Sequence, residues 1–319
     1  MKAVCLVIGT GSAGYRHISV LKQLGAEVLV FPLRSSRLDY WSEKGFQVIR
    51  DWSDNQLSRV THVVIASETK LHLEYLSKFA LHGVPVLIEK PVSISSADMN
   101  AFTEKHKEFN EEQIQVACCL RFSKSLQKFR ESLADVDRLH SVFVRCQSYL
   151  PDWRPSRDYK ESYSADMKQG GVMRDLVHEL DYTGWIFGWP ETLSSHALST
   201  GRLDIQVDDV ALMNWASSEG FVCSIYLDYL SRSPERGIKA YGEKGMIEWD
   251  GITGEVFFTE GKREREKIFS ESQTLEQLTL AQDRAFLNED GEDHIFLASW
   301  RDGLNALKMI DDVQVQYCR

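Results

Sequence analysis

A glycine-rich segment near the N-terminus places the strongest constraint on how this chain can fold. Residues 3–8 are a continuous apolar run, which is typical of a buried strand, and they lead directly into Gly9-x-Gly11-x-x-Gly14. A helical pattern follows, and residues 28–31 predict a second strand. The first glycine permits a tight turn, the second lets the backbone approach a pyrophosphate, and the third lets the helix pack on the strand. This βαβ pattern therefore predicts a dinucleotide site at the helix N-terminus.

The residues after the second predicted strand indicate which coenzyme this site would accept. An acidic residue about 20 positions past the third glycine usually binds the ribose hydroxyl of NAD. Here Arg34, Ser35 and Arg37 occupy this region, and the first carboxylate is Asp39. Two arginines with neighbouring hydroxyls suit a 2′-phosphate, which favours NADP over NAD. The alternative is a basic surface loop, with NAD held by other groups.

Two further predicted strands end in polar residues. Residues 62–66 precede Ser67 and Glu68, and the apolar residues of 84–88 precede a Glu-Lys-Pro sequence centred on Lys90. Ligands of open α/β sheets bind at the carboxyl ends of the strands. Lys90 is therefore placed to meet a substrate or coenzyme. The alternative is a solvated lysine that merely begins a turn.

The order of the predicted elements indicates the fold class. Strands and helices alternate up to about residue 122, which predicts a doubly wound parallel sheet. Strand-length runs separated by turn signals fill residues 193–259 and predict consecutive hairpins. We therefore expect an α/β protein with an N-terminal Rossmann domain (residues 1–121) and a C-terminal α/β domain (residues 122–319) built on an open, mainly antiparallel sheet. Residues 262–267 are charged, which predicts a solvated loop.

A helical segment in the second domain combines an acid and a histidine. Two glycines at 170–171 precede a pattern that predicts one helix up to Gly188. Asp175 and His178 are three residues apart, so the carboxylate can orient or charge-stabilise the imidazole. Such a histidine is a suitable general base near neutral pH. A structural His–Asp pair is the alternative. A metal site that adds Asp181 is a weaker one, because the spacing suggests no further His or Cys ligand.

The segment 149–160 is aromatic and basic, although the chain as a whole has a net charge of −10. Aromatic faces can stack on sugar rings, and arginines bind carboxylate or phosphate groups. The segment is therefore a candidate substrate clamp, and a surface loop held by stacking is the alternative. The residues that would contact substrate are Trp153, Arg154, Arg157, Tyr159 and Lys160.

The composition argues against several classes of protein. The acidic net charge and the lack of a long basic run argue against a nucleic-acid partner. We expect no membrane association, because no apolar stretch reaches the length of a membrane span and the N-terminal run is too short for a signal peptide. The six cysteines show no paired spacing, so we expect reduced thiols in a cytoplasmic protein, with no metal site.

Taken in order, these motifs resemble those of the Gfo/Idh/MocA oxidoreductases, named for glucose-fructose oxidoreductase and inositol dehydrogenase. The resemblance rests on the glycine turn, on Glu-Lys-Pro at 89–91, and on the glycine pair at 170–171 followed by Asp175-x-x-His178. It implies hydride transfer between NAD(P) and a sugar or polyol, frequently a nucleotide sugar. It also implies a homo-oligomer, dimer or tetramer, formed through the C-terminal sheet. The sequence after Tyr149 is similar to that of members found among bacterial surface-polysaccharide genes.

The resemblance also implies roles for individual residues. Lys90 and His178 match the catalytic lysine and histidine, and Asp175 matches their acidic partner, although many members space the last two residues by four rather than three. The expected cofactor contacts are Gly9, Thr10, Gly11, Ser12, Ala13, Gly14, Arg34, Ser35, Arg37, Ser67, Glu68, His72, Glu89, Lys90 and Arg121. The expected substrate contacts are Lys90, Trp153, Arg154, Arg157, Tyr159, Lys160, Asp175 and His178. Two alternatives are an enzyme whose tightly bound cofactor never leaves, including a redox-neutral glycosidase-type enzyme, and a non-catalytic NADP-binding sensor.

Overall fold

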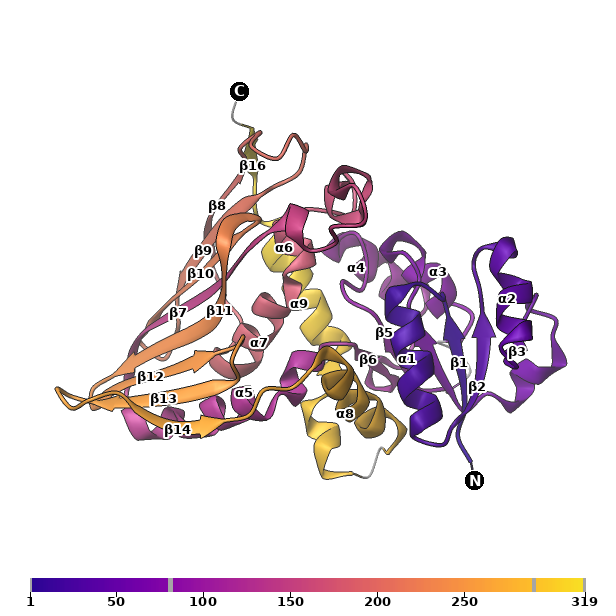
Figure 1. Ribbon diagram of the computed structural model, residues 1–319, viewed down its shortest axis with the longest axis horizontal. Coiled ribbons are helices and arrows are strands. Elements are labelled where there is room, and N and C mark those ends of the chain that lie inside the picture. The colour runs from indigo at the N-terminus through magenta and orange to yellow at the C-terminus, as the bar shows by residue number, and fades with distance from the viewer. Residues whose placement is uncertain (1, 80–82, 289–290, 318–319) are drawn as a thin grey trace. The chain divides into compact units, whose positions relative to one another are not determined.

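A computed structural model describes residues 2–79, 83–288 and 291–317 of the chain. The chain forms two compact units, and Figure 1 labels most of their helices and strands. The first unit comprises Met1–Phe122 and Thr274–Leu304, and the second comprises Ser123–Gln273 and Asn305–Arg319. The expected division after residue 121 assigned residues 274–304 to the second domain. In the structure this segment packs with the first unit, because its helix α8 lies against α1.

The first unit is built on a seven-stranded sheet in the order β15-β6-β5-β4-β1-β2-β3. All neighbouring strands are parallel except β15, which pairs antiparallel with β6. This order confirms the predicted doubly wound sheet. The strands are β1 (Val4–Ile8), β2 (Glu27–Phe31), β3 (Gln47–Val48), β4 (His62–Ile65), β5 (Val86–Ile88), β6 (Ile114–Val116) and β15 (Ala298–Ser299).

Buried aliphatic side chains hold the helices of this unit on the sheet. Val7 of β1, Val64 of β4 and Leu87 of β5 belong to one core cluster with Leu21 of α1 and Phe286 of α8. Because β1 lies between β2 and β4, the turns that follow these three strands share one edge of the sheet. The helices are α1 (Ser12–Gln23), α2 (Leu38–Glu43), α3 (His72–Leu76), α4 (Ser96–Lys105), α8 (Leu275–Leu287) and the first part of α9 (Trp300–Asp311).

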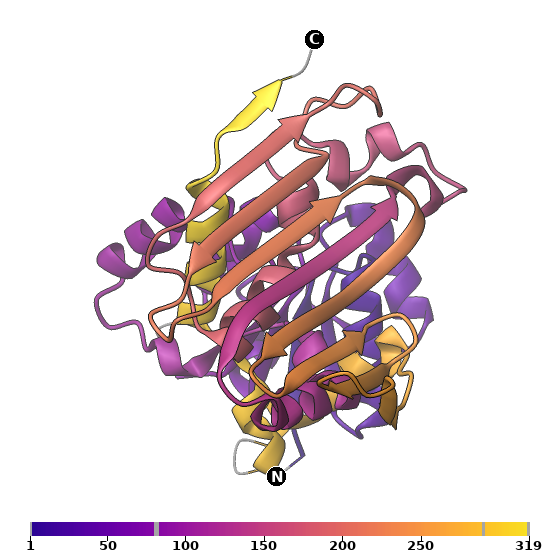
Figure 2. The ribbon, with the colours of Figure 1, turned by 90° about the vertical axis from the view of Figure 1, so that its left-hand side faces the viewer.

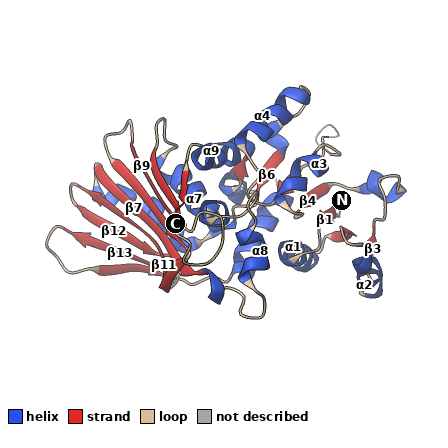
Figure 3. Cartoon of the chain, turned by 90° about the horizontal axis from the view of Figure 1, so that it is seen from above, coloured by secondary structure: helices blue, strands red, loops and turns tan. Residues whose placement is uncertain are grey.

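The second unit is built on a nine-stranded sheet in the order β14-β13-β12-β11-β7-β10-β9-β8-β16. Figure 2 shows its broad face, and Figure 3 shows its strands as a fan. Only the pairs β7–β10 and β8–β16 are parallel, so the prediction of a mainly antiparallel sheet is confirmed. The strands are β7 (Leu139–Tyr149), β8 (Ser194–Ser199), β9 (Val210–Ala216), β10 (Val222–Asp228), β11 (Leu230–Gly242), β12 (Gly245–Asp250), β13 (Glu255–Glu260), β14 (Glu266–Ser270) and β16 (Val315–Tyr317).

The helices described in this unit are α5 (Lys124–Glu131), α6 (Val172–Asp175), α7 (Val177–Phe187) and the part of α9 from Asn305 on. The predicted solvated loop at 262–267 is wrong at its end, because β14 begins at Glu266 and pairs with β13. As an edge strand it keeps charged side chains in solvent, and Lys267 forms an ion pair with Glu255 across the two strands. Because β14 begins within a charged run, the sequence pattern did not identify its first residues as a strand.

Two further findings concern the chain as a whole. Among the helices of the described residues, none is both long and apolar enough to cross a lipid bilayer. The cysteine side chains that the structure describes are buried thiols, and Cys318 lies outside the described residues. Burial raises the pKa of the Cys5 thiol to about 12, which makes that thiol unreactive at neutral pH.

Candidate functional site

The glycine-rich turn joins β1 to α1 and leaves space at the start of that helix. Gly9 has a φ of +90°, and a Cβ atom there would overlap the carbonyl oxygen of Ala66 after β4. A Cβ atom at Gly14 would overlap the carbonyl oxygen of Gly9, whereas one at Gly11 would meet nothing within 4 Å. The fold itself therefore requires Gly9 and Gly14, and the space at Gly11 lets phosphates approach the helix N-terminus. The remaining turn residues, Thr10, Ser12 and Ala13, are half-buried or exposed.

The residues predicted to choose between NAD and NADP lie on the surface after β2. The Gly9 N–H donates a hydrogen bond of 3.0 Å to the carbonyl oxygen of Phe31, which fixes the end of β2 against the glycine turn. The carboxylate of Asp39, the first acidic residue in this region, is 3.7 Å from the guanidinium of Arg50. Basic and hydroxyl groups thus surround the position where a ribose-binding carboxylate would be expected. The exposed residues here are Arg34, Ser35 and Arg37.

His72 connects the loops that follow β4 and β5. Its two ring nitrogens lie 3.0 Å from the carbonyl oxygen of Pro91 and 3.1 Å from that of Ser67. Burial lowers the pKa of the imidazole, and the carbonyl oxygens of Ser67 and Pro91 oppose this shift. The structure thus uses His72 to shape these loops. Glu68, also predicted to contact the cofactor, is exposed and forms an ion pair of 2.8 Å with Lys70.

The Glu-Lys-Pro sequence directly follows β5. The Glu89 N–H donates a hydrogen bond of 2.8 Å to the carbonyl oxygen of Ile65 on the neighbouring strand, which places the sequence at the carboxyl edge of the sheet. Lys90 is half-buried, and its backbone N–H donates to Oε2 of Glu89 (3.2 Å). The other carboxylate oxygen of Glu89 accepts a hydrogen bond from His17 of α1. The sequence analysis assigned no role to His17.

Arg121, also predicted to contact the cofactor, is almost completely buried. Its guanidinium forms an ion pair of 3.3 Å with Asp302, which lies in the first turn of α9. The position of Arg121 is thus set by a residue 181 positions further along the chain (302 − 121). No local pattern predicts this ion pair.

Asp175 and His178 lie on two helices rather than one. Asp175 ends α6 and His178 is the second residue of α7, and the two helices are separated by Leu176, which has a φ of −92° and a ψ of 28°. The predicted continuous helix is therefore wrong. The two helices have separate anchors: a buried aspartate, Asp208, caps α6, and a buried glutamate, Glu179, holds α7. The contacts of both anchors join distant parts of the chain, so no local pattern contains them.

Asp208 fixes the start of α6. Its Oδ2 accepts a hydrogen bond of 3.0 Å from the Met173 N–H, and its carbonyl oxygen accepts one of 2.9 Å from the Val172 N–H. A Cβ atom at Gly171 would overlap the Asp208 carboxylate, and Gly171 has a φ of +102°. This glycine is thus required so that the carboxylate can reach the helix N-terminus. On α7, the buried carboxylate of Glu179 lies 2.7 Å from Nε of Arg236 on β11.

The carboxylate of Asp175 is held by a tyrosine that sequence reasoning missed. Tyr229 is completely buried, and its hydroxyl donates a hydrogen bond of 2.7 Å to Oδ2 of Asp175. Burial and the charge of Asp175 raise the pKa of Tyr229 well above its usual value, so the hydroxyl remains a donor. The ring of Trp153 packs edge-on against Tyr229, with centroids 5.4 Å apart. The predicted clamp segment therefore contacts the residue that orients Asp175.

The predicted substrate clamp is tied down at one end. The Tyr159 hydroxyl donates to the carbonyl oxygen of Leu203 (2.9 Å), and the Lys160 ammonium lies 2.6 Å from the Asp204 carboxylate. These two side chains, both expected to contact substrate, are thus engaged in positioning the loop. Arg154 and Arg157 lie between Trp153 and Tyr159 and are exposed.

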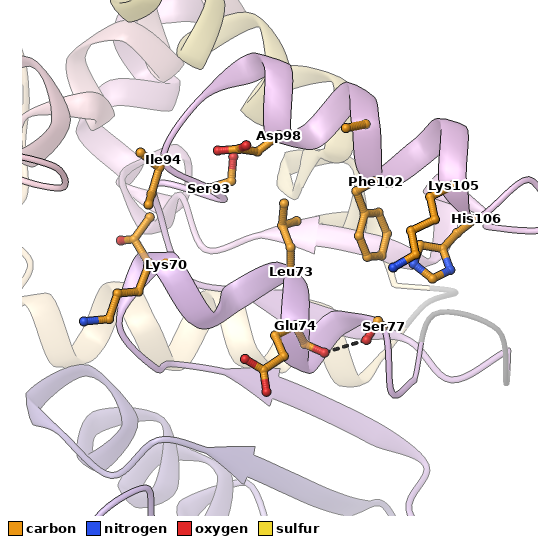
Figure 4. Close-up of a pocket in the computed structure, with 12 residues that line it drawn as sticks. Lys70, Leu73, Glu74, Ser77, Ser93, Ile94, Asp98, Phe102, Lys105 and His106 are labelled. Atoms are coloured by element: carbon orange, nitrogen blue, oxygen red, sulfur yellow. Dashed lines mark hydrogen bonds between the residues drawn. The ribbon is translucent and has the colours of Figure 1, made fainter.

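A separate pocket of about 580 Å³ lies between α3 and α4 in the first unit. In Figure 4, Leu73 of α3 and Phe102 of α4 point toward each other across it, and Lys105 lies near the end of α4. The residues that line this pocket do not include any of the predicted cofactor or substrate contacts. The pocket is therefore distinct from the glycine turn and from the Glu-Lys-Pro sequence.

Two family models match most of the chain. Residues 4–117 match the model described as "Oxidoreductase family, NAD-binding Rossmann fold" of the GFO_IDH_MocA group. Residues 137–248 match the GFO/IDH/MocA C-terminal domain. The two matches lie in the two units described above and include every residue of the glycine turn, Lys90, Asp175 and His178.

Similar proteins have been characterised by sequence and by structure. Inositol 2-dehydrogenase of Rubrobacter xylanophilus is 25% identical over 258 residues, which cover 78% of this chain and 72% of that protein. An oxidoreductase from Agrobacterium radiobacter, solved in complex with NAD+, L-tartaric acid and magnesium, has the same fold, with a TM-score of 0.80 at 18% identity and coverage of 98% and 95% of the two chains. UDP-N-acetylglucosamine 3-dehydrogenase from Acidithiobacillus ferrooxidans gives a TM-score of 0.79 at 18% identity and covers 98% and 97%.

Proposed function

This chain belongs to the Gfo/Idh/MocA family of NAD-binding oxidoreductases, and we propose that it acts on a secondary hydroxyl or keto group of a sugar, polyol or nucleotide sugar. The observation that carries this proposal is the position of Lys90. It follows the buried strand β5 in the same unit as the dinucleotide-type glycine turn, and Glu89 fixes its backbone. The named activities of the inositol and UDP-N-acetylglucosamine dehydrogenases support the substrate class.

The glycine turn fits a nicotinamide dinucleotide, because the space beside Gly11 at the start of α1 is open. A Cβ atom at Gly11 would meet no other atom within 4 Å. The backbone N–H groups at the start of that helix would hold the pyrophosphate, and the helix dipole favours its negative charge. When bound, the coenzyme supplies the acceptor or donor of the hydride. The residues of the chain supply the binding site and the proton chemistry.

We assign proton transfer to His178 and polarisation of the reacting oxygen to Lys90. His178 accepts the hydroxyl proton as a general base during oxidation and returns it during reduction. The Lys90 ammonium donates a hydrogen bond to the same oxygen as negative charge develops there. Asp175 stabilises the imidazolium form of His178, and Tyr229 orients Asp175. The exposed guanidinium groups of the 149–160 segment, those of Arg154 and Arg157, bind an anionic group of the substrate.

We also propose that the coenzyme is NADP in preference to NAD. Arg34 and Arg37 are exposed after β2, and the Asp39 carboxylate is near Arg50. Guanidinium groups bind a 2′-phosphate strongly, whereas NAD recognition commonly uses a carboxylate at this place. Titration of the purified protein with NADPH and NADH, followed by nicotinamide fluorescence, tests this. We expect tighter binding of NADPH and loss of the preference in Arg34→Ala, with Arg59→Ala as the control. Tighter binding of NADH would contradict the NADP assignment.

A substrate screen tests the activity itself. The purified protein is incubated with NAD+ or NADP+ and with myo-inositol, D-glucose or UDP-N-acetylglucosamine, and nicotinamide absorbance is followed. We expect turnover of at least one of them, and His178→Ala and Lys90→Ala should each lower kcat about 10²–10⁴-fold. Matched controls are His196→Ala and Lys78→Ala, because both side chains are exposed. Unchanged turnover in the His178 variant would remove the base assignment. Nucleotide retained through purification, with no net turnover, would favour the enzyme with a permanently bound cofactor.

The broad sheet of the second unit is the surface through which we propose that the chain forms a homo-oligomer. Phe143 of β7 and Val222 of β10 are half-exposed, and Tyr226 of β10 is exposed to a similar degree. The paired strands bring these apolar side chains to one face of the sheet. Contiguous apolar groups on a sheet face are typical of a protein interface.

A further inference from the structure

Besides the proposed catalytic residues, three ionisable side chains of the first unit lie together, two of them buried and one half-buried. His17 of α1, which is 1% exposed, lies between two carboxylates. Its Nδ1 is 2.8 Å and 3.0 Å from the two oxygens of Asp283 on α8, and its Nε2 is 3.3 Å from Oε1 of Glu89. The exposed fractions of Asp283 and Glu89 are 0% and 16%. The three groups come from parts of the chain up to 266 residues apart.

The geometry requires the doubly protonated form of the imidazole. Carboxylates accept hydrogen bonds, and both ring nitrogens face one, so both nitrogens must donate. Burial by itself lowers the pKa of His17, but the charges and hydrogen bonds of Asp283 and Glu89 outweigh burial and raise the pKa to about 10. The same contacts with His17 outweigh burial for Glu89 and lower the pKa of its carboxyl group. The site therefore holds one cation between two anions at neutral pH.

The other charged groups near this triad have small or indirect effects. Lys90 and Arg16 act on Glu89 by favouring its charged form. On the α8 side, the Gln282 amide donates to Oδ1 of Asp283 (3.3 Å). The Cys5 thiol on β1 senses the charge of Asp283, and it is protonated at neutral pH because its pKa is raised to about 12. The protonation state of His17 is thus determined mainly by the two carboxylates that it contacts.

We propose that His17 is a positioning residue for Lys90 and that Asp283 keeps it in the charged form needed for this role. The connection is Glu89, whose two oxygens are both in use. Oε1 accepts the His17 hydrogen bond, and Oε2 accepts the backbone N–H of Lys90. The imidazolium therefore fixes the carboxylate, and the carboxylate fixes the backbone from which the Lys90 side chain projects. This inference rests on the proposed function, because it gives His17 an effect on catalysis only if Lys90 has one.

The chain segment that returns to the first unit, residues 274–304, also has a role in this arrangement. Asp283 lies on α8, whose first turn carries a capping box formed by Thr274 and Gln277. This helix packs on α1 and presents a carboxylate to the helix that begins at the glycine turn. The segment thus does more than fill the core. Its Asp283 carboxylate supplies the negative charge that keeps His17 protonated, while Glu89 accepts a hydrogen bond from the backbone N–H of Lys90.

The first test measures the charge of His17 without any substrate. Histidine side chains labelled with ¹⁵N are followed by NMR as the pH is raised, and the His17 signals are assigned by their loss in His17→Gln. We expect His17 to stay doubly protonated to above pH 9 in the wild type, because its pKa is about 10. In Asp283→Asn it should lose a proton at a clearly lower pH. A neutral His17 at pH 7 in the wild type would overturn the proposal.

The second test measures the effect on Lys90. With the substrate found in the screen, we expect His17→Gln to lower kcat at least tenfold while the Kd of the coenzyme changes less than threefold. Asp283→Asn should lose activity progressively as the pH rises, through the new His17 pKa, whereas the wild type should not. Ser19→Ala, an exposed change on the same helix, is the control. Wild-type kcat in a folded His17→Gln protein would overturn the proposal. Wild-type kcat in Lys90→Ala would instead overturn the proposed function.

The environment of the Lys90 side chain can also be measured without turnover. Reductive ¹³C-methylation labels the lysine side chains, and the Lys90 signal is identified by its absence in Lys90→Arg. We expect this signal to move in His17→Gln and in Asp283→Asn, while the signal of the exposed Lys78 stays in place. An unmoved Lys90 signal in both variants would contradict the link through Glu89, whatever substrate the enzyme uses.

Discussion

The hydroxyl of Tyr229 donates a hydrogen bond of 2.7 Å to the carboxylate of Asp175, and the tyrosine side chain is completely buried. Asp175 lies at the end of α6, directly before the break at Leu176, so helical geometry alone does not fix its carboxylate. The tyrosine supplies this orientation from the short link between β10 and β11. The ring of Trp153 packs edge-on against the ring of Tyr229, so the 149–160 segment is connected to Asp175 through this tyrosine.

We expect Tyr229→Phe to lower kcat about tenfold, equivalent to about 1.4 kcal/mol of transition-state stabilisation. The phenyl ring fills the same space, but Asp175 loses its hydrogen-bond donor and can rotate away from the orientation that supports His178. Steady-state kinetics with the substrate found in the screen measure this, and the Kd of the coenzyme should stay the same. Tyr317→Phe is the matched control, since that ring is exposed. Equal kcat values for Tyr229→Phe and wild type would show that the hydrogen bond does not serve catalysis.

Two substitutions in the glycine turn should separate folding from coenzyme binding. Gly14→Ala places a Cβ atom on the carbonyl oxygen of Gly9, so we expect a loss of about 1–3 kcal/mol in the free energy of unfolding. Gly11→Ala meets open space in the protein, so we expect normal stability but weaker binding of NAD(P)H. Urea unfolding and fluorescence titration measure the two effects. Normal coenzyme affinity in a stable Gly11→Ala protein would place the phosphates elsewhere.

The elements that the sequence predicted are those defined by local patterns. The buried strands β1, β4 and β5 are short apolar runs, and the glycine turn between β1 and α1 is a local motif with its own steric requirement. The relationships that it did not predict depend on residues far apart in the chain. Asp283 is 266 residues from His17, and Tyr229 is 54 residues from Asp175, so spacing contains no information about either pair.

The break between α6 and α7 shows the same limit within one segment. The residues 172–187 have a helical pattern, and the prediction of a single helix follows from it. The structure ends α6 at Asp175 and begins α7 at Val177. The carboxylate of Asp208 caps α6 from another part of the chain and fits only beside a glycine at position 171. The pair of glycines at 170–171 was visible in the sequence, but the close contact of Gly171 with the Asp208 carboxylate was not.

The charge of His17 should make thermal stability depend on pH. Its folded pKa of about 10 is above the ordinary histidine value of 6.5, so its contribution is complete below pH 6.5 and is lost as the pH rises through about 10. We expect the Tm of the wild type to fall between pH 7 and pH 10, by about 2–4 °C for each kcal/mol lost in a unit of this size. Calorimetry of His17→Gln should show a smaller fall over this range. Parallel curves for the two proteins would contradict the assignment of the charge.

The exposed apolar face of the larger sheet gives a prediction about assembly. Phe143 on β7 and Val222 on β10 have exposed fractions of 50% and 53%, and such groups are usually covered when they lie together on a sheet face. We expect light scattering coupled to size-exclusion chromatography to give a dimer or tetramer for the wild type and a lower mass for Phe143→Glu, because a buried carboxylate would destabilise the interface. Ile295→Glu is the control, since Ile295 is 75% exposed and lies in the first unit. A monomeric wild type, or an unchanged mass for Phe143→Glu, would show that this face is not the interface.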